Sequence, residues 1–162
     1  MKILLAIDGS DGSRAALQHA IARPWPSTTE MRVVSVAHTH LPILVDPAFT
    51  LAAVRHELLE RDRQRASRDA QEAAEVIRVS VSWLRVTSRA LEGDPKKVIL
   101  SEARKWGADL IILGSHNHGV VRRFLLGSVT RAVVLHASCS VEIVRRHKTP
   151  QPTHSASHRQ VP

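Results

Sequence analysis

The stretch with the clearest potential for chemistry is 114–128, GSHNHGVVRRFLLGS. It begins and ends at a glycine next to a serine, and it carries His116, His118, Arg122 and Arg123 between them. Glycine-flanked backbone N–H groups can hold a phosphate, and two histidines one residue apart can bind a metal. The same composition is also typical of an ordinary loop, so the rest of the chain must distinguish three interpretations.

The metal interpretation is the weakest of the three. A structural zinc needs about four ligands, and no cysteine, aspartate or glutamate near His116 and His118 completes such a set. We therefore expect loop histidines close to a phosphate. The guanidinium groups of Arg122 and Arg123 match phosphate geometry and could clamp a triphosphate, but they could equally be solvated.

Two positions on either side of this stretch favour an anion site. Gly127-Ser128 begins an expected helix, whose free N–H groups attract anions, and the hydroxyls of Ser128 and Thr130 add donors. Asp8 follows the first apolar run and could hold a ribose hydroxyl or a magnesium ion, or simply cap its helix. If the strands before Asp8 and Gly114 are neighbours, the two residues face one crevice. Neither GxxxxGK[ST] nor GxGxxG occurs in the chain.

The remaining chain must position these residues, and its hydrophobic pattern predicts alternating strands and helices. Short apolar runs indicate buried strands, and one alternating run, 76–86, indicates a strand with a solvated face at a sheet edge. The expected strands are 2–8, 31–37, 76–86, 108–114 and 140–146. The expected helices are 13–22, about 48–76, 96–108 and 128–137. This alternation favours an α/β fold with an open parallel sheet and helices on both faces.

Turn residues mark the ends of the expected helices. Ser10 or Asp11 can cap the first helix, and Pro47 stands at the start of the second. Pro95 and Gly107 bound the third helix. The second half of the long second helix offers mostly alanine for burial, so we expect it to be partly exposed.

Composition indicates a single globular domain. The chain has 162 residues, of which 43% are hydrophobic, and no apolar run is long enough to span a membrane. The lone Cys139 excludes an internal disulfide and fits a reducing compartment, so we expect a cytoplasmic protein with no membrane partner. Cys139 and His136 lack an orienting acid, which disfavours a catalytic pair.

The net charge of +8 is distributed unevenly. The segment from Arg145 onward carries Arg145, Arg146, Lys148 and Arg159 and no acidic residue. No basic stripe with interleaved aromatic residues is visible, so we expect no specific nucleic-acid partner. Residues 147–162, rich in Pro, Ser, Thr and His, are expected to form a flexible basic tail.

Several motifs in register resemble the universal stress protein family. The stretch GSHNHGVVRRFLLGSVT is similar to the family signature, glycine-x2-glycine-x9-glycine-Ser/Thr. The opening KILLAIDGSDGSRAAL, the EGDP before the third helix, WGADLIILGSH and the closing CSVEIVRR agree in order and spacing. The resemblance covers about residues 1–146, which we expect to be one domain. It implies a flavodoxin-like three-layer α/β/α sandwich with strand order 3-2-1-4-5, usually as a homodimer, in which some members bind ATP.

The resemblance also implies roles for individual residues. Asp8 would lie near the ribose and phosphates and hold Mg²⁺ through ATP, Val36 would touch adenine, and Leu113 would pack near the base or sugar. Gly114 and 127–130 would wrap the ribose and triphosphate. The full set of expected nucleotide-binding residues is Ala6, Ile7, Asp8, Val36, Leu113, Gly114, His116, Asn117, Gly119, Arg122, Arg123, Gly127, Ser128, Val129 and Thr130.

One departure from the signature keeps two other hypotheses open. The second signature glycine is Asn117 here, and asparagine tolerates left-handed backbone angles but places a side chain where phosphate would approach. Gly119 restores some flexibility. The first hypothesis is a cytoplasmic, ATP-binding, homodimeric stress-response regulator. The alternatives are a nucleotide-free interaction module whose site Asn117 closes, and a slow ATPase, for which no catalytic residue is evident.

The last expected strand suggests how a homodimer could form. Its sequence, SVEIVRR, is expected at an edge of the sheet, where unpaired backbone N–H and C=O groups can pair with another strand. Antiparallel pairing of the strand Ser140 to Arg145 with its copy would give a symmetric dimer, as the resemblance also implies.

Overall fold

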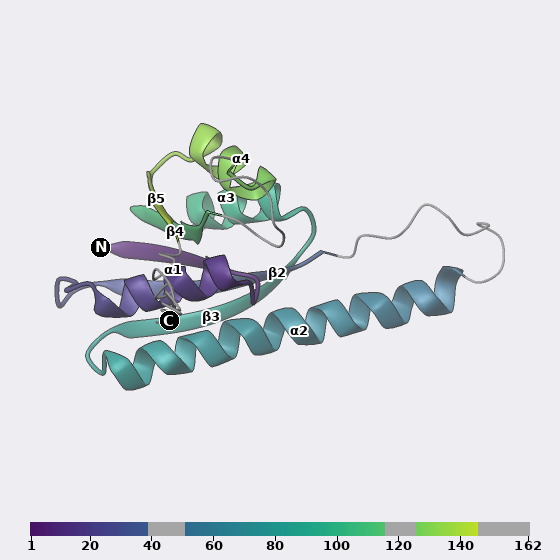
Figure 1. Cartoon of the computed structure of the whole chain (residues 1–162), viewed down its shortest axis with the longest axis horizontal. Coiled ribbons are helices and arrows are strands. Elements are labelled where there is room, and N and C mark those ends of the chain that lie inside the picture. Colours follow the sequence, from purple (N-terminus) through teal and green to yellow (C-terminus); the bar gives the residue numbers. More distant parts are fainter. Residues whose placement is uncertain (39–50, 116–125, 146–162) are drawn as a thin grey trace, which may run out of the picture.

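The computed structural model describes residues 1–38, 51–115 and 126–145 (Figure 1). Strands and helices alternate along these residues. Their bounds are β1 Lys2–Ile7, α1 Asp11–Ala22, β2 Glu30–Ala37, α2 Leu51–Ser80, β3 Arg85–Glu92, α3 Pro95–Trp106, β4 Leu110–Gly114, α4 Ser128–His136 and β5 Ser140–Val144.

The five strands form one parallel sheet in the order β3-β2-β1-β4-β5. Ala6 of β1 lies between Val34 of β2 and Leu113 of β4, so β4 ends level with β1 while β2 runs two residues further, to Ala37. The strand order reverses between β1 and β4. The predicted flavodoxin-like fold and strand order are therefore confirmed.

Two helices cover each face of the sheet (Figure 1). One core contains Ile3, Leu5 and Ile7 of β1 with the alanines of α1 and α2. The opposite core contains Leu4 and Ala6 of the same strand with residues of α3 and α4. Since successive residues of a strand face opposite sides, the continuous apolar run of β1 is required by a sheet buried on both faces.

The helix ends follow the predicted signals. The Ser10 hydroxyl accepts a hydrogen bond from the Ser13 N–H at 3.2 Å and caps α1. Pro95 begins α3, and Gly107 ends it in a left-handed conformation with φ of +69°. No helix among 1–38, 51–115 and 126–145 is long and apolar enough to cross a bilayer.

The predicted strand at 76–86 is wrong. Residues 76–80 complete α2, and β3 begins at Arg85. Ala73, Ala74 and Ile77 are buried three and four residues apart, so helical packing on the sheet overrides the alternation of apolar residues. Strand β3 does lie at a sheet edge, as expected, but its sequence RVTSRALE is too polar to stand out as a strand.

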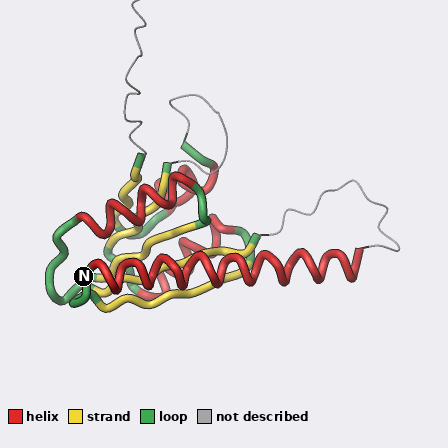
Figure 2. Tube along the Cα trace, turned by 60° about the horizontal axis from the view of Figure 1, so that its bottom comes forward, coloured by secondary structure: helices red, strands yellow, loops and turns green. Residues whose placement is uncertain are grey.

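Helix α2 is the longest element, with 30 residues, and its N-terminal half extends past the sheet (Figure 2). Its second half packs on the sheet mainly through small residues, including Ala66, Ala70 and Ala74. This agrees with the expected alanine-rich, partly exposed helix. The extension carries α2 alongside the carboxyl ends of the strands, where the cleft described next is found.

Candidate functional site

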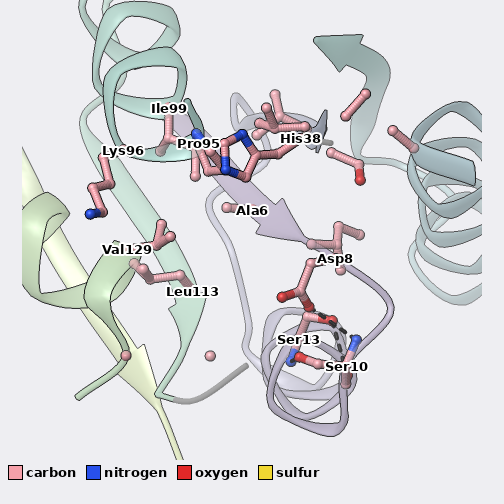
Figure 3. A pocket seen from close by; sticks show the side chains of 18 of the residues that line it. Ala6, Asp8, Ser10, Ser13, His38, Pro95, Lys96, Ile99, Leu113 and Val129 are labelled. Atoms are coloured by element: carbon pink, nitrogen blue, oxygen red, sulfur yellow. Dashed lines mark hydrogen bonds between the residues drawn. The ribbon is translucent and has the colours of Figure 1, made fainter. Parts of the chain in front are cut away.

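A cleft of about 670 Å³ lies at the carboxyl ends of β1, β2 and β4. Figure 3 shows Asp8, Ser10 and Ser13 on one side of the cleft and Pro95, Lys96 and Ile99 on the other. The position matches the general rule that open parallel sheets bind ligands where the strand order reverses. The side chains that line it come from all three layers of the sandwich.

One half of the cleft is an apolar slot, which we define by six side chains on the α3 and α4 side of the sheet. All six belong to, or pack against, the core under those two helices. They are Ala6, Val34, Val36, Ile99, Leu113 and Val129. Such a slot is suited to a flat apolar group, because burying apolar surface is favourable and no polar partner is needed there.

The polar half of the cleft is centred on Asp8, which follows the last residue of β1. Its Oδ1 accepts a hydrogen bond from the Ser10 N–H at 3.0 Å, so the carboxylate is held at the turn into α1. Ser13 and Ser35 also line this half, and both are buried. Ser10, not Asp8, caps α1, while Asp8 organises the turn before the helix and lines the cleft, where its role toward a ligand stays a prediction.

The start of α4 differs from the other helix starts on the cleft. The first helix is capped by Ser10 and the third by Asp94, whereas no side chain within 1–38, 51–115 and 126–145 caps α4 at Gly127. The Gly127 N–H itself donates to the Ser115 carbonyl at 3.0 Å. The donors that face the cleft are therefore the N–H groups of the first helical turn, which begins at Ser128.

The predicted hydroxyl donor at Thr130 has a structural partner. Its Oγ1 donates to the Gly114 carbonyl oxygen at 2.9 Å, and the residue is 4% exposed. This bond ties α4 to the end of β4. Thr130 thus lines the cleft, but its hydroxyl proton is donated within the protein and holds the helix in place. Ser128 also lines the cleft and is exposed.

Gly114 is required by packing as well as by its place in the cleft. A Cβ atom at this position would lie 2.4 Å from the Gly12 carbonyl carbon and 2.8 Å from the Ser13 nitrogen. No side chain fits at such distances from backbone. The first turn of α1 therefore packs directly on the end of β4, and a residue expected to approach phosphate is also a packing contact.

Helix α2 supplies a wall of the cleft through Asp62, Arg65 and Ala66. One turn further on, Asp69 lies over the turn at Gly9, whose φ is +75°. Burial raises the pKa of Asp69, with smaller contributions from the carboxylates of Glu72 and Asp8, while Arg65 opposes the shift. The α2 wall thus brings a second carboxylate close to Asp8.

The structure gathers many of the predicted nucleotide-binding residues into this one cleft. Those that line it are Ala6, Ile7, Asp8, Val36, Leu113, Gly114, Gly127, Ser128, Val129 and Thr130. The other predicted residues lie outside the described residues. They are His116, Asn117, Gly119, Arg122 and Arg123, together with His118, Pro47 and the tail 147–162.

Sequence reasoning missed the contributions of α2 and α3. Asp94, Pro95 and Lys96 follow β3 directly, so correct placement of that strand would have assigned them to the carboxyl edge of the sheet. Asp62 and Arg65 gave no such signal, because they lie in mid-helix and only the tertiary packing of α2 brings them to the cleft.

Cysteine and metal chemistry find little support in the described part of the chain. No group of three or more His, Cys, Asp or Glu residues there could hold a metal ion. Cys139 packs against the core under α3 and α4, and burial, with the nearby Asp109 carboxylate, raises the pKa of its thiol. A raised pKa disfavours the nucleophilic thiolate.

Fold and cleft define a flavodoxin-like α/β protein with an open site at the point where the strand order reverses. A model of the universal stress protein family matches residues 1–145. A universal stress protein of Methanocaldococcus jannaschii is 32% identical over 148 residues, which cover 91% of this chain and 83% of that protein. One from Thermus aquaticus is 34% identical over 146 residues, which cover 88% and 97%. The chain therefore belongs to the universal stress protein family.

Solved structures share the same architecture. The universal stress protein UspA from Lactobacillus plantarum has a TM-score of 0.71 at 25% identity, covering 90% of this chain and 97% of that one. An Arabidopsis thaliana family member with AMP bound gives 0.61 at 17% identity, covering 95% and 97%. A universal stress protein in complex with cAMP gives 0.56 at 19% identity, covering 90% and 96%. At these last two identities the likeness is one of fold.

Proposed function

We propose that this protein binds an adenine nucleotide, with ATP as the expected ligand, in the cleft at the ends of β1, β2 and β4. The observation that carries the proposal is the start of α4, at Ser128, which no side chain of the described residues caps and which shares the cleft with the apolar slot. A helix start attracts phosphate, and an apolar slot accepts a purine base. The two solved family members that hold AMP and cAMP support the same ligand class.

Each part of the nucleotide has a counterpart in the cleft. The base would lie in the apolar slot against Val36, and the ribose would lie near Asp8, whose carboxylate accepts hydrogen bonds from hydroxyl groups. The phosphates would extend toward Ser128 and the first turn of α4. Because Gly127 and Thr130 already use their N–H and hydroxyl in the protein, the helix N–H groups would carry most of the phosphate binding.

Magnesium fits the site only together with the nucleotide. Mg²⁺ is commonly held by one or two carboxylates plus phosphate oxygens, and Asp8 offers such a carboxylate in the cleft. Bound there, the ion would neutralise phosphate charge. We extend the proposal to a cytoplasmic regulator of stress responses whose state depends on nucleotide occupancy, and any catalysis would be slow ATP hydrolysis.

Replacement of Asp8 by asparagine should weaken ATP binding about tenfold, because a hydrogen bond to a charged carboxylate is lost while the side-chain shape is kept. The asparagine oxygen can still accept from the Ser10 N–H, so the turn into α1 should survive. Calorimetric titration of the nucleotide-free protein with ATP and Mg²⁺ measures the affinity of each form.

Asp11→Asn is the matched control, since it removes the same charge three residues away on a side chain outside the cleft lining. Its affinity for ATP should equal that of the wild type. Absence of ATP binding by the wild type at millimolar concentration would overturn the proposal and favour the nucleotide-free interaction module.

We further propose that β5 pairs with its copy in a homodimer. Ser140 donates to the Asp109 carbonyl and the Val144 carbonyl accepts from Ser115, so these residues face β4. Since hydrogen bonding alternates along a parallel strand, Val141 and Ile143 present their backbone groups to the open edge. Two exposed apolar side chains of the adjacent α4, Val134 and Leu135, add surface for a partner.

Ile143→Pro should convert the dimer to a monomer, because proline removes one N–H from the open edge and leaves the bonds to β4 intact. Ile143→Ala keeps that N–H and should remain dimeric at concentrations where the proline variant is monomeric. Sedimentation velocity over a concentration series distinguishes the two. A wild-type protein that sediments as a monomer throughout the micromolar range would contradict the dimer.

A further inference from the structure

Lys96 is a cationic residue in the wall of the cleft, next to the apolar slot. It follows Pro95 at the start of α3, and its backbone N–H donates to Asp94 Oδ1 at 3.0 Å, which fixes the first turn of the helix. Ile99 of the slot comes three residues later, and residues three apart share one face of a helix. The same face of α3 therefore presents an apolar group to the slot and a cation beside it.

The side chain of Lys96 is directed toward α4. Lys96 lines the cleft and is half-buried, whereas the adjacent Lys97 is exposed and does not line it. Figure 3 shows the Lys96 side chain extending from α3 toward α4, on the same side of the cleft as Val129. Val129 follows Ser128, the first residue of α4. An anion bound at the start of α4 would therefore lie on the side of the cleft toward which Lys96 extends.

The charges around the cleft leave the Lys96 ammonium group available for an anion. The carboxylates and the Lys and Arg side chains that line the cleft are Asp8, Asp62, Arg65, Asp94 and Lys96. Arg65 Nε lies 3.9 Å from Asp69 Oδ2, whereas no ion pair joins Lys96 to a carboxylate within 1–38, 51–115 and 126–145. A half-buried ammonium group without a counter-ion favours an anionic ligand, because partial burial weakens the solvation of its charge.

We propose that Lys96 binds the phosphate chain of the nucleotide, with its ammonium group paired to phosphate oxygens near the start of α4. The inference rests on the proposed nucleotide binding and adds a charged side chain to the helix N–H groups. Asp94 already accepts from the Lys96 N–H, so α3 contributes to anion binding through this side chain and not through its own start. Since Asp8 lies on the opposite side of the cleft, Lys96 and an ion held by Asp8 would contact the phosphates from two sides.

The test removes the charge of Lys96 and then restores it. Lys96→Met keeps an unbranched side chain without charge and should weaken ATP binding about tenfold, the effect of one lost charge-assisted hydrogen bond. Lys96→Arg keeps the positive charge and should bind ATP within about threefold of the wild type. Lys97→Met is the matched control, because it removes the same charge from the next residue, outside the cleft lining. Its affinity should stay within about twofold of the wild type, as expected for an exposed charge.

Calorimetric titration with ATP and Mg²⁺ at several salt concentrations measures all four proteins. Salt screens the attraction between an ammonium group and phosphate. Added salt should therefore weaken ATP binding more steeply in the wild type and Lys97→Met than in Lys96→Met, a difference that a merely structural role of Lys96 would not produce. Urea unfolding without nucleotide should show equal stability for the wild type and Lys96→Met, since the substitution breaks no ion pair within the described residues.

The outcomes separate this inference from the proposed function. If Lys96→Met binds ATP as tightly as the wild type, Lys96 does not bind phosphate, and nucleotide binding remains in place. Equal weakening by Lys96→Met and Lys96→Arg would assign the effect to side-chain shape, and equal weakening by Lys96→Met and Lys97→Met would assign it to overall surface charge. Either result overturns the inference. If the wild type does not bind ATP, the proposed function fails and the inference with it.

Discussion

Replacement of Glu102 by glutamine is expected to lower the free energy of unfolding by about 3 kcal/mol, because it removes the charge of a buried ion-pair partner. Glu102 Oε1 accepts from Arg32 at 2.8 Å and from Arg89 at 2.9 Å, which joins α3 to β2 and β3. The side chain of Glu102 is 8% exposed and that of Arg32 19%. Glutamine keeps the shape, so the guanidinium of Arg32 stays largely buried without a counter-ion.

The surroundings of Arg32 prevent it from moving to solvent. Its guanidinium lies 4.3 Å from the centre of the Trp106 ring, which holds it against α3. Glu57→Gln makes the same chemical change at an exposed pair with Arg61 and should cost only about 0.3 kcal/mol. Urea unfolding followed by circular dichroism measures both variants. Equal losses in the free energy of unfolding for the two variants would show that burial of Glu102 does not strengthen its ion pair.

The parts of the fold that could be predicted are those whose signals are local. β1 and β4 are continuous apolar runs, and the helix boundaries at Ser10, Pro95 and Gly107 follow directly from residue types. The boundary between α2 and β3 could not be predicted in this way. Burial of Ala73, Ala74 and Ile77 against the sheet decides it, and that contact exists only in the folded protein.

The candidate site shows the same division. Asp8 and Gly114 follow predicted strands, and the rule for parallel sheets brings them to one cleft. The hydrogen-bond partners of the site residues could not be predicted from the sequence, because those partners lie more than ten residues away along the chain. The Thr130 hydroxyl donates to the Gly114 carbonyl, and the Gly127 N–H donates to the Ser115 carbonyl. Some of the groups expected to bind phosphate therefore hold α4 on the end of β4.

Gly114→Ala is expected to lower the free energy of unfolding by about 3 kcal/mol, in the upper range for an added methyl group in a tightly packed site. The new Cβ would meet the backbone of Gly12 and Ser13 at 2.4 to 2.8 Å. Backbone atoms cannot rotate away as a side chain can, so the first turn of α1 must move off β4. Because only Gly9 and Ser10 separate α1 from Asp8, the same shift should widen the cleft. Urea unfolding without nucleotide measures the loss of stability.

Gly107→Ala is the matched control, because it adds the same methyl group where no atom lies within 4 Å. Its φ of +69° still penalises a side chain, so a cost of about 1 kcal/mol is expected from the backbone alone. The difference between the two variants then isolates the steric contact with α1. If Gly114→Ala costs no more than Gly107→Ala yet abolishes ATP binding, the glycine serves the ligand and not the packing. If it costs more in the absence of any nucleotide, the signature glycine is first a requirement of the fold, and the phosphate site is built on a contact that the protein needs in any case.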